Sequence, residues 1–151
     1  MTIIIRPARQ EDQEKIVSLI KEAKLNPRNL TWKHFLVAEK DEQMVGIRQV
    51  KVYEDGTKEV ASGFVLPEYR RQGISAQLMT ALLAREAGPV YTMVNEKRAP
   101  YYEQFGFRRV DINQLPSDFR KEYRIGRIVT TLMSIFSKER IKIIPLKREP
   151  S

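Results

Sequence analysis

Apolar residues recur along the chain with two periods, which separate predicted helices from predicted strands. Residues 11–24 and 74–86 have the helical spacing, with apolar positions three and four residues apart and polar residues between them. These positions are Ile16, Leu19, Ile20 and Ala23 in the first stretch, and Ile74, Leu78, Met79, Leu82 and Leu83 in the second. Gly88-Pro89 ends the second pattern, as glycine followed by proline commonly does beyond a helix.

Seven shorter stretches have the composition of β-strands. They are residues 2–6, 35–39, 44–53, 58–66, 90–94, 107–110 and 140–146. Asp55-Gly56 between the third and fourth stretches predicts a type I′ hairpin, in which both central residues have positive φ. The strand, turn, helix and strand that follow, up to residue 94, predict a right-handed parallel crossover.

Glycine interrupts two of the predicted elements. Gly63 lies inside the fourth strand, where it indicates a bulge, a close approach of the backbone, or simply a small residue. Gly126 separates two predicted helices, residues 116–123 and 127–137, which come after a short helix at 96–104. Five apolar residues form a stripe on the last of these helices: Ile128, Val129, Leu132, Ile135 and Phe136.

The composition excludes several classes of protein. A chain of 151 residues, 42% hydrophobic and 30% charged, predicts one globular domain over residues 1–151. It has no apolar run long enough to span a bilayer and no signal-peptide pattern at its start, so we expect a cytoplasmic protein. With no cysteine, disulfides and thiolate metal sites are excluded, and with His34 as the single histidine no zinc site is expected.

The net charge of +8 is concentrated near the C-terminus. Residues 1–118 carry 18 Lys and Arg against 16 Asp and Glu, whereas residues 119–148 carry nine against two. Such a segment favours a polyanion, an acidic membrane surface, an acidic partner or an anionic substrate. We favour a simpler interpretation over nucleic acid or membrane contact: the apolar stripe covers the domain or a second subunit of a homodimer, and the charges are solvated.

A basic turn joins the fourth strand to the second helix. It reads Val65-Leu66-Pro67-Glu68-Tyr69-Arg70-Arg71-Gln72-Gly73-Ile74-Ser75. The first N–H groups of a helix have no intrahelical partners, and the helix dipole favours an anion beside them. This turn is therefore predicted to bind a phosphate group.

A second constellation follows the fifth strand, with Asn95, Ala99 and the run Tyr102-Glu103-Gln104-Phe105-Gly106-Phe107. Together the two stretches resemble the GCN5-related N-acetyltransferase (GNAT) family, which has V-x-P-E-Y-R-x-x-G-x-G/A before its third helix and N-x6-Y-E-x-x-G-F after its fifth strand. The order of predicted elements over residues 2–110 agrees. The resemblance implies an α/β (α+β) GNAT fold: a mixed, mostly antiparallel sheet of about seven strands flanked by helices. Here an additional helical segment precedes the last strand.

The resemblance also implies how acetyl-CoA binds. The backbone near Val65 would pair with the pantetheine amides as an added strand does, and a bulge at Gly63 would open the slot. The residues implied to contact the co-substrate are Phe64, Val65, Arg70, Arg71, Gln72, Gly73, Ile74, Ser75, Asn95 and Tyr102. Ser75 departs from the pattern, which has Gly or Ala there. It is strained if its φ is positive, and otherwise its hydroxyl adds a phosphate contact. Asn95 has an equally good interpretation as a helix cap.

Two residues are implied to carry the chemistry. Tyr102 matches the family's tyrosine that protonates the departing thiolate, a role that suits a phenol at neutral pH, although a packed aromatic is the alternative. The acceptor amine has to lose a proton, and Glu59 is the best candidate base because histone-acetylating members carry a glutamate there. A solvated Glu59 with a water relay is the alternative, and His34 is a weaker candidate.

The implied reaction is direct transfer of an acetyl group from acetyl-CoA to a primary amine in a ternary complex. A route through a cysteine is excluded because the chain has none. The alternative is a non-catalytic acyl-CoA-binding sensor or scaffold. The acceptor, a small-molecule or peptide amine, and the length of the acyl group stay open. The pocket for the acceptor is expected to be built from residues 25–35 and 111–140. The basic C-terminal segment favours an acceptor that carries a carboxylate.

Overall fold

The computed structural model describes residues 2–150, which form two compact units. The first comprises the chain up to Lys51 together with Val60–Glu86, and the second comprises Val52–Glu59 together with the chain from Ala87 onward. The expectation of one domain over residues 1–151 stays a prediction.

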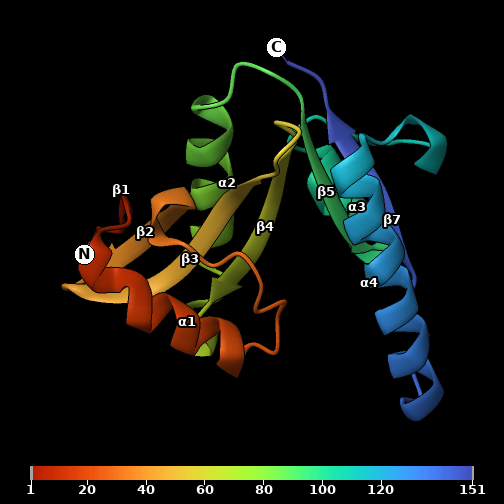
Figure 1. Ribbon diagram of the computed structural model, residues 1–151. Coiled ribbons are helices and arrows are strands. Elements are labelled where there is room, and N and C mark those ends of the chain that lie inside the picture. Colours follow the sequence, from red (N-terminus) through yellow and green to blue (C-terminus); the bar gives the residue numbers. More distant parts are fainter. Residues whose placement is uncertain (1, 151) are drawn as a thin grey trace. The chain divides into compact units, whose positions relative to one another are not determined.

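A seven-stranded sheet has the order β1-β2-β3-β4-β5-β7-β6 (Figure 1). The strands are β1 (Ile4–Pro7), β2 (Phe35–Lys40), β3 (Gln43–Val52), β4 (Lys58–Val65), β5 (Val90–Asn95), β6 (Phe107–Arg109) and β7 (Ile143–Arg148). Glu59 of β4 pairs with Tyr91 of β5 in parallel, whereas β1 with β2, β2 with β3, β5 with β7 and β6 with β7 pair antiparallel. The predicted mixed, mostly antiparallel sheet and its parallel crossover are confirmed.

Four α-helices accompany the sheet: α1 (Gln13–Glu22), α2 (Ile74–Ala84), α3 (Ala99–Glu103) and α4 (Ser117–Phe136). Short 3-10 turns precede several elements, among them Trp32–His34, Pro67–Tyr69 and Glu96–Arg98. The helices predicted at 11–24, 74–86 and 96–104 are therefore present, and the additional helical segment before the last strand is α4.

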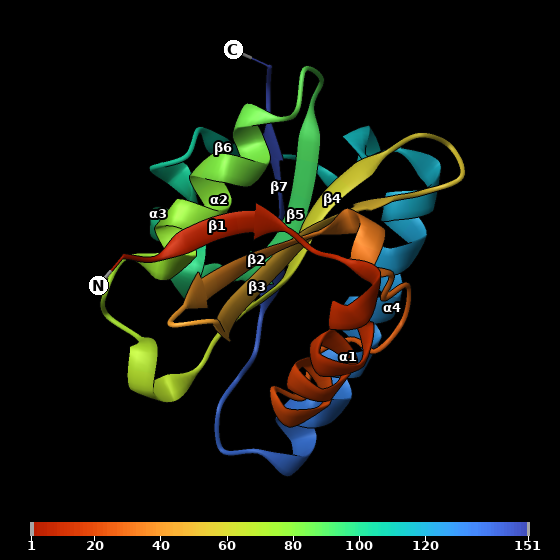
Figure 2. The same ribbon diagram turned by 90° about the vertical axis from the view of Figure 1, so that its left-hand side faces the viewer.

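The first unit packs around β3, which is buried from Met44 to Lys51 (Figure 2). Gly46 faces α2 closely, because a Cβ built there would lie 3.2 Å from Ile74 Cγ2 and 3.3 Å from Leu78 Cδ1. Ile16, Leu19 and Ile20 of α1 are also fully buried. The apolar stripes read from the sequence are thus the ones that form this core.

The hairpin between β3 and β4 differs from the predicted type I′ turn. Gly56 has φ of 88°, but Asp55 keeps a negative φ. The N–H of Gly56 donates to the carbonyl of Tyr53, and the N–H of Tyr53 donates to the carbonyl of Thr57. These bonds describe a type I turn followed by a left-handed glycine, the geometry of a three-residue hairpin loop. Asp55 Oδ1 accepts from the N–H of Thr57, which favours the negative φ.

The prediction of two helices separated at Gly126 is wrong, because α4 is continuous from Ser117 to Phe136. Gly126 lies where this helix approaches its neighbours most closely. A Cβ there would lie 3.1 Å from Ile143 Cδ1 and 3.2 Å from Met93 Sδ. The glycine therefore permits this close packing and does not end the helix.

The second unit is built on an aromatic cluster beneath α4. Its buried members are Tyr91, Leu115, Phe119 and Tyr123, and Tyr53, Met93, Val110, Ile112 and Ile143 pack against them. The rings of Tyr91 and Phe119 lie 5.4 Å apart. The β3–β4 hairpin joins the start of α4 through two bonds: Asp118 Oδ2 accepts from the N–H of Asp55, and Asp55 Oδ2 accepts from the N–H of Asp118.

Gly126→Leu is expected to lower the free energy of unfolding by about 1–3 kcal/mol, because the added atoms overlap Ile143 and Met93. Urea denaturation followed by circular dichroism measures this. Gly88→Leu is the matched control, since a Cβ at Gly88 meets open space and that variant is expected to stay within about 0.5 kcal/mol. Equal stability of the two variants would show that close packing does not explain Gly126.

Candidate functional site

The turn between β4 and α2 is closed by Arg70. Its Nε donates to the carbonyl of Val65 over 2.9 Å, and its guanidinium lies 5.4 Å from the centre of the Phe64 ring. Arg70 is therefore more than a solvated charge, because it ties the turn to the end of β4. Its remaining guanidinium N–H groups extend the positive charge of the turn.

Two residues with left-handed backbone shape the rest of the turn. Arg71 has φ of 63° and Gly73, the N-cap of α2, has φ of 78°. Both residues and Gln72 between them are exposed. Successive N–H groups in such turns converge on a concave anion site, and the first turn of α2 adds its own N–H groups and the positive end of its dipole. Phosphate binding at this turn stays a prediction.

Ser75 lies inside α2 and has no positive φ, so the strain considered from the sequence does not arise. Its Oγ accepts a long bond of 3.4 Å from Arg48 Nη2 of β3. The departure from the family pattern thus coincides with a contact to a buried arginine of the same unit.

The same arginine explains Gly63. A Cβ built on Gly63 would overlap Arg48 Nη2 and lie 2.6 Å from its Cζ. The guanidinium therefore occupies the space of a side chain beside β4. The preceding residue, Ser62, has φ of 59°, and its Oγ accepts from Gln49 Nε2 over 2.7 Å. The sequence suggested a bulge or a close approach of the backbone at Gly63; what lies against Gly63 is the side chain of Arg48.

The second unit holds Asn95 and Tyr102. Asn95 Oδ1 accepts from the N–H of Lys97, so Asn95 caps the 3-10 turn before α3. Tyr102 is buried, and its ring meets those of Tyr101 and Phe107 edge to face, with centroids 5.5 and 5.9 Å away. Neighbouring Tyr101 is only half-buried, so the two tyrosines of α3 differ in exposure.

Glu59 is buried, with 6% of its surface exposed, and this is not the solvated position considered from the sequence. Its Oε1 accepts a 2.5 Å bond from the hydroxyl of Tyr53. Sequence reasoning missed Tyr53. The signal was the length of the hairpin loop: pairing Tyr53 with Thr57 makes Tyr53 and Glu59 diagonal neighbours across the hairpin.

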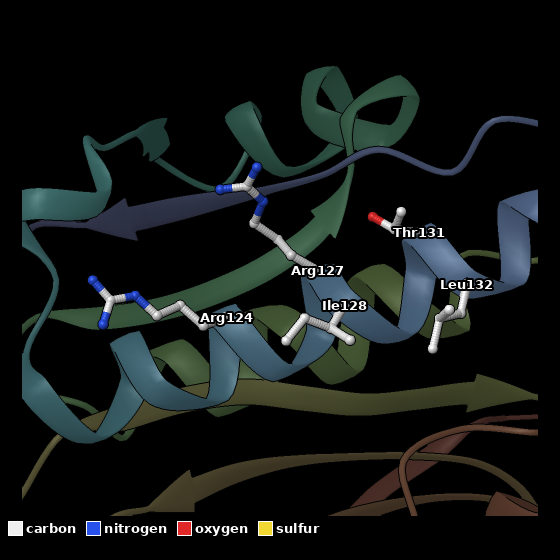
Figure 3. Close-up of a pocket in the computed structure, with 5 residues that line it drawn as sticks. All are labelled: Arg124, Arg127, Ile128, Thr131 and Leu132. Atoms are coloured by element: carbon white, nitrogen blue, oxygen red, sulfur yellow. The ribbon is translucent and has the colours of Figure 1, made fainter.

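An open pocket of about 450 Å³ lies along α4 (Figure 3). Its lining residues are Arg124, Arg127, Ile128, Thr131 and Leu132. The guanidinium of Arg127 lies 5.9 Å from the centre of the Tyr123 ring. Burial raises the pKa of Tyr123, against the opposing charges of Arg127 and Arg109, so this residue stays a phenol that donates to the carbonyl of Ile143.

The apolar stripe predicted on this helix is exposed. Ile128, Leu132 and Phe136 are 62%, 53% and 89% exposed, whereas Phe119 and Tyr123 of α4 are buried. The expectation that the stripe covers the domain is therefore wrong, and its contact with a second subunit stays a prediction. No helix in residues 2–150 is both long and apolar enough to cross a membrane.

No group of three or more His, Asp or Glu side chains within residues 2–150 could hold a metal ion. His34 ends the 3-10 turn before β2 and is half-buried. It lies in the first unit, as do Phe64, Val65 and the turn from Arg70 to Ser75, whereas Glu59, Asn95 and Tyr102 belong to the second unit.

A family model described as "Acetyltransferase (GNAT) domain" matches residues 31–109, more than half of the chain. The chain belongs to this family. The resemblance seen in the two motifs is confirmed, since both lie within the matched residues. A comparison with curated protein sequences finds no match.

Solved structures of GNAT acetyltransferases share the fold. N-acetylglutamate synthase from Neisseria gonorrhoeae, complexed with coenzyme A and N-acetyl-glutamate, has a TM-score of 0.76 and 19% identity over 100% of this chain and 36% of that chain. Rv2747 from Mycobacterium tuberculosis, in complex with CoA and NLQ, has a TM-score of 0.72 and 19% identity over 98% of this chain and 99% of that chain. A GNAT-family acetyltransferase from Staphylococcus aureus has a TM-score of 0.67 and 14% identity over 98% of this chain and 99% of that chain. The chain thus spans little more than a third of the Neisseria enzyme.

Ser75→Gly is expected to keep coenzyme A affinity within about tenfold, because the hydroxyl's bond to Arg48 is long and the backbone N–H remains. Isothermal titration calorimetry of the full chain measures this. Gly73→Ala is the comparison and should lose more, since φ of 78° strains alanine although its Cβ meets open space. A loss of coenzyme A affinity well beyond tenfold in Ser75→Gly would identify the Ser75 hydroxyl as a phosphate ligand.

Proposed function

We propose that this chain is an acetyl-CoA-dependent N-acetyltransferase that moves an acetyl group directly to a primary amine. The observation that carries the proposal is the turn after β4, where left-handed Arg71 and Gly73 direct N–H groups of a helix start into an exposed cradle beside Arg70. The family membership and the coenzyme A complexes of two similar structures support it.

In this proposal the first unit binds the acetyl-CoA. The N–H groups from Arg71 to Ser75 hold the pyrophosphate, and the guanidinium groups of Arg70 and Arg71 add charge. The backbone at Phe64 and Val65 pairs with the pantetheine amides, and N–H groups near Val65 stabilise the oxyanion of the reacting thioester. The bond from Arg70 to the carbonyl of Val65 holds this strand end and the cradle in a constant relation.

The second unit supplies the proton transfers. Glu59 accepts the proton of the attacking amine, and the hydroxyl of Tyr102 protonates the thiolate that leaves. A lysine-like amine with a pKa of about 10.4 is almost entirely protonated at pH 7, so a base is needed. The hydrogen bond from Tyr53 fixes the orientation of the Glu59 carboxylate, and this makes Tyr53 a positioning residue.

Release of free thiol from acetyl-CoA over a panel of amines and peptides tests the proposal. Turnover with any amine supports an enzyme. Coenzyme A binding without turnover over the whole panel would favour the alternative, a GNAT scaffold that senses or holds acyl-CoA. A parallel series with longer acyl-CoA thioesters defines the acyl group.

Tyr102→Phe is expected to lower kcat at least about tenfold, because the thiolate then leaves without its proton donor. The measurement is the rate of thiol release at saturating acetyl-CoA. Tyr101→Phe is the matched control on the neighbouring residue of α3 and should retain the rate. If Tyr102→Phe is as active as the control, another group protonates the thiolate.

Tyr53→Phe is expected to move the acidic limb of the kcat/KM pH profile to higher pH, because the Glu59 carboxylate loses a hydrogen-bond donor that favours its charged form. Tyr123→Phe removes a buried phenol from the same aromatic cluster and should leave that limb in place. Glu59→Gln should abolish the limb. An unchanged profile in Tyr53→Phe and Glu59→Gln would exclude Glu59 as the base.

A further inference from the structure

The pocket on α4 combines two cationic side chains with an apolar surface. Arg124 and Arg127 lie one turn apart, and Ile128 and Leu132 follow on the next two turns (Figure 3). Thr131 adds a hydroxyl. The volume of about 450 Å³ is that of a small-molecule site, which typically has about 300–1,000 Å³.

The two arginines have no carboxylate to pair with. Within residues 2–150, Arg124 makes no ion pair or side-chain hydrogen bond, and the side chain of Arg127 contacts only the ring of Tyr123. The chain carries no acidic residue from Tyr123 to Lys138. A guanidinium group without an acidic partner is suited to recognise a carboxylate, since it presents a planar fork of donors.

One lining residue of the pocket and the hydrogen-bond donor to the candidate base both contact the aromatic cluster beneath α4. Tyr123, which Arg127 contacts, is a member of the aromatic cluster beneath α4, and Tyr53, which donates to Glu59, packs against that same cluster. A ligand held by the arginines and the base that deprotonates an amine therefore belong to one compact unit.

We infer that this pocket binds the acceptor, and that the acceptor is an amine that also carries a carboxylate and an aliphatic body, as an amino acid does. Arg124 and Arg127 bind the carboxylate, and Ile128 and Leu132 contact the aliphatic part. The inference rests on the proposed transferase function and adds to it the substrate class.

Two matched acceptors test the inference: leucine, and 3-methylbutylamine, which is leucine without its carboxylate. We expect the chain to acetylate leucine at least about tenfold more efficiently in kcat/KM, the gain of one charge-assisted hydrogen bond or more. Arg124→Gln and Arg127→Gln should each remove most of this preference by raising the KM for leucine, with the KM for acetyl-CoA unchanged. Lys138→Gln removes one positive charge outside the pocket and should keep the preference.

A binding measurement makes the test independent of turnover. N-acetyl-leucine, the product of the same reaction, is titrated into the full chain by calorimetry. Binding that Arg124→Gln and Arg127→Gln weaken at least about tenfold supports the pocket even if no amine is acetylated, an outcome that would reject only the proposed function. If the chain shows no preference for leucine and the variants do not change the binding of N-acetyl-leucine, the assignment of this pocket to the acceptor is overturned. The proposed transferase function is then unaffected.

An acidic membrane surface would also suit two arginines beside apolar side chains. Vesicle binding by the same variants distinguishes it from an acceptor. Co-sedimentation with phosphatidylglycerol vesicles that is lost in Arg124→Gln and Arg127→Gln, while acceptor preference stays unchanged, would overturn the acceptor assignment. Retained vesicle binding, or none, together with lost acceptor preference supports it.

Discussion

The path of the chain between β4 and α2 depends on two residues with left-handed backbone. Arg71 and Gly73 turn the chain so that α2 begins at an exposed bend, and the first N–H groups of the helix are presented there. The backbone conformation, and not lack of space, requires glycine at position 73, because a Cβ there would touch nothing. The Nε of Arg70 donates to the carbonyl of Val65, the last residue of β4, and so links the bend to the strand end.

A buried arginine couples three elements of the first unit. Arg48 of β3 lies over Gly63 of β4 and donates to Ser75 of α2, so the position of each element limits the other two. A side chain larger than hydrogen at residue 63 would displace the guanidinium. This explains a glycine inside a strand, where it otherwise weakens the ladder. It also explains why serine is accommodated at residue 75, where the hydroxyl has a partner.

The elements with a strong hydrophobic period were predictable from the sequence, and the errors lie where tertiary contact overrides a local rule. Glycine inside a helix is normally a weak point, but Gly126 is compensated by the close approach of Ile143 and Met93. Asp55-Gly56 normally favours a type I′ turn, but the Asp55 side chain bonds to the N–H of Thr57 and selects another loop. The motif residues were identified by resemblance. Tyr53 was not, because its contact with Glu59 depends on the register of a hairpin. A pocket was expected within residues 111–140, but which of them line it depends on the rotation of α4.

The basic C-terminal segment is not a uniform charged surface, and this bears on what it binds. Arg120 donates to the carbonyls of Asn113 and Leu115, Arg148 donates to that of Phe105, and Lys147 pairs with Glu149.

These three cations interact with other residues of the chain. The number of basic residues in the segment therefore overstates the positive charge that is available to a ligand. Along α4, Phe119 and Tyr123 are buried, and at Gly126 the helix lies close to Ile143 and Met93 of the strands beside it. Arg124, Arg127, Ile128 and Leu132 line an open pocket on this helix (Figure 3). A few localised charges beside aliphatic side chains suit a small carboxylate better than an extended polyanion, which gains affinity from many spaced phosphate contacts.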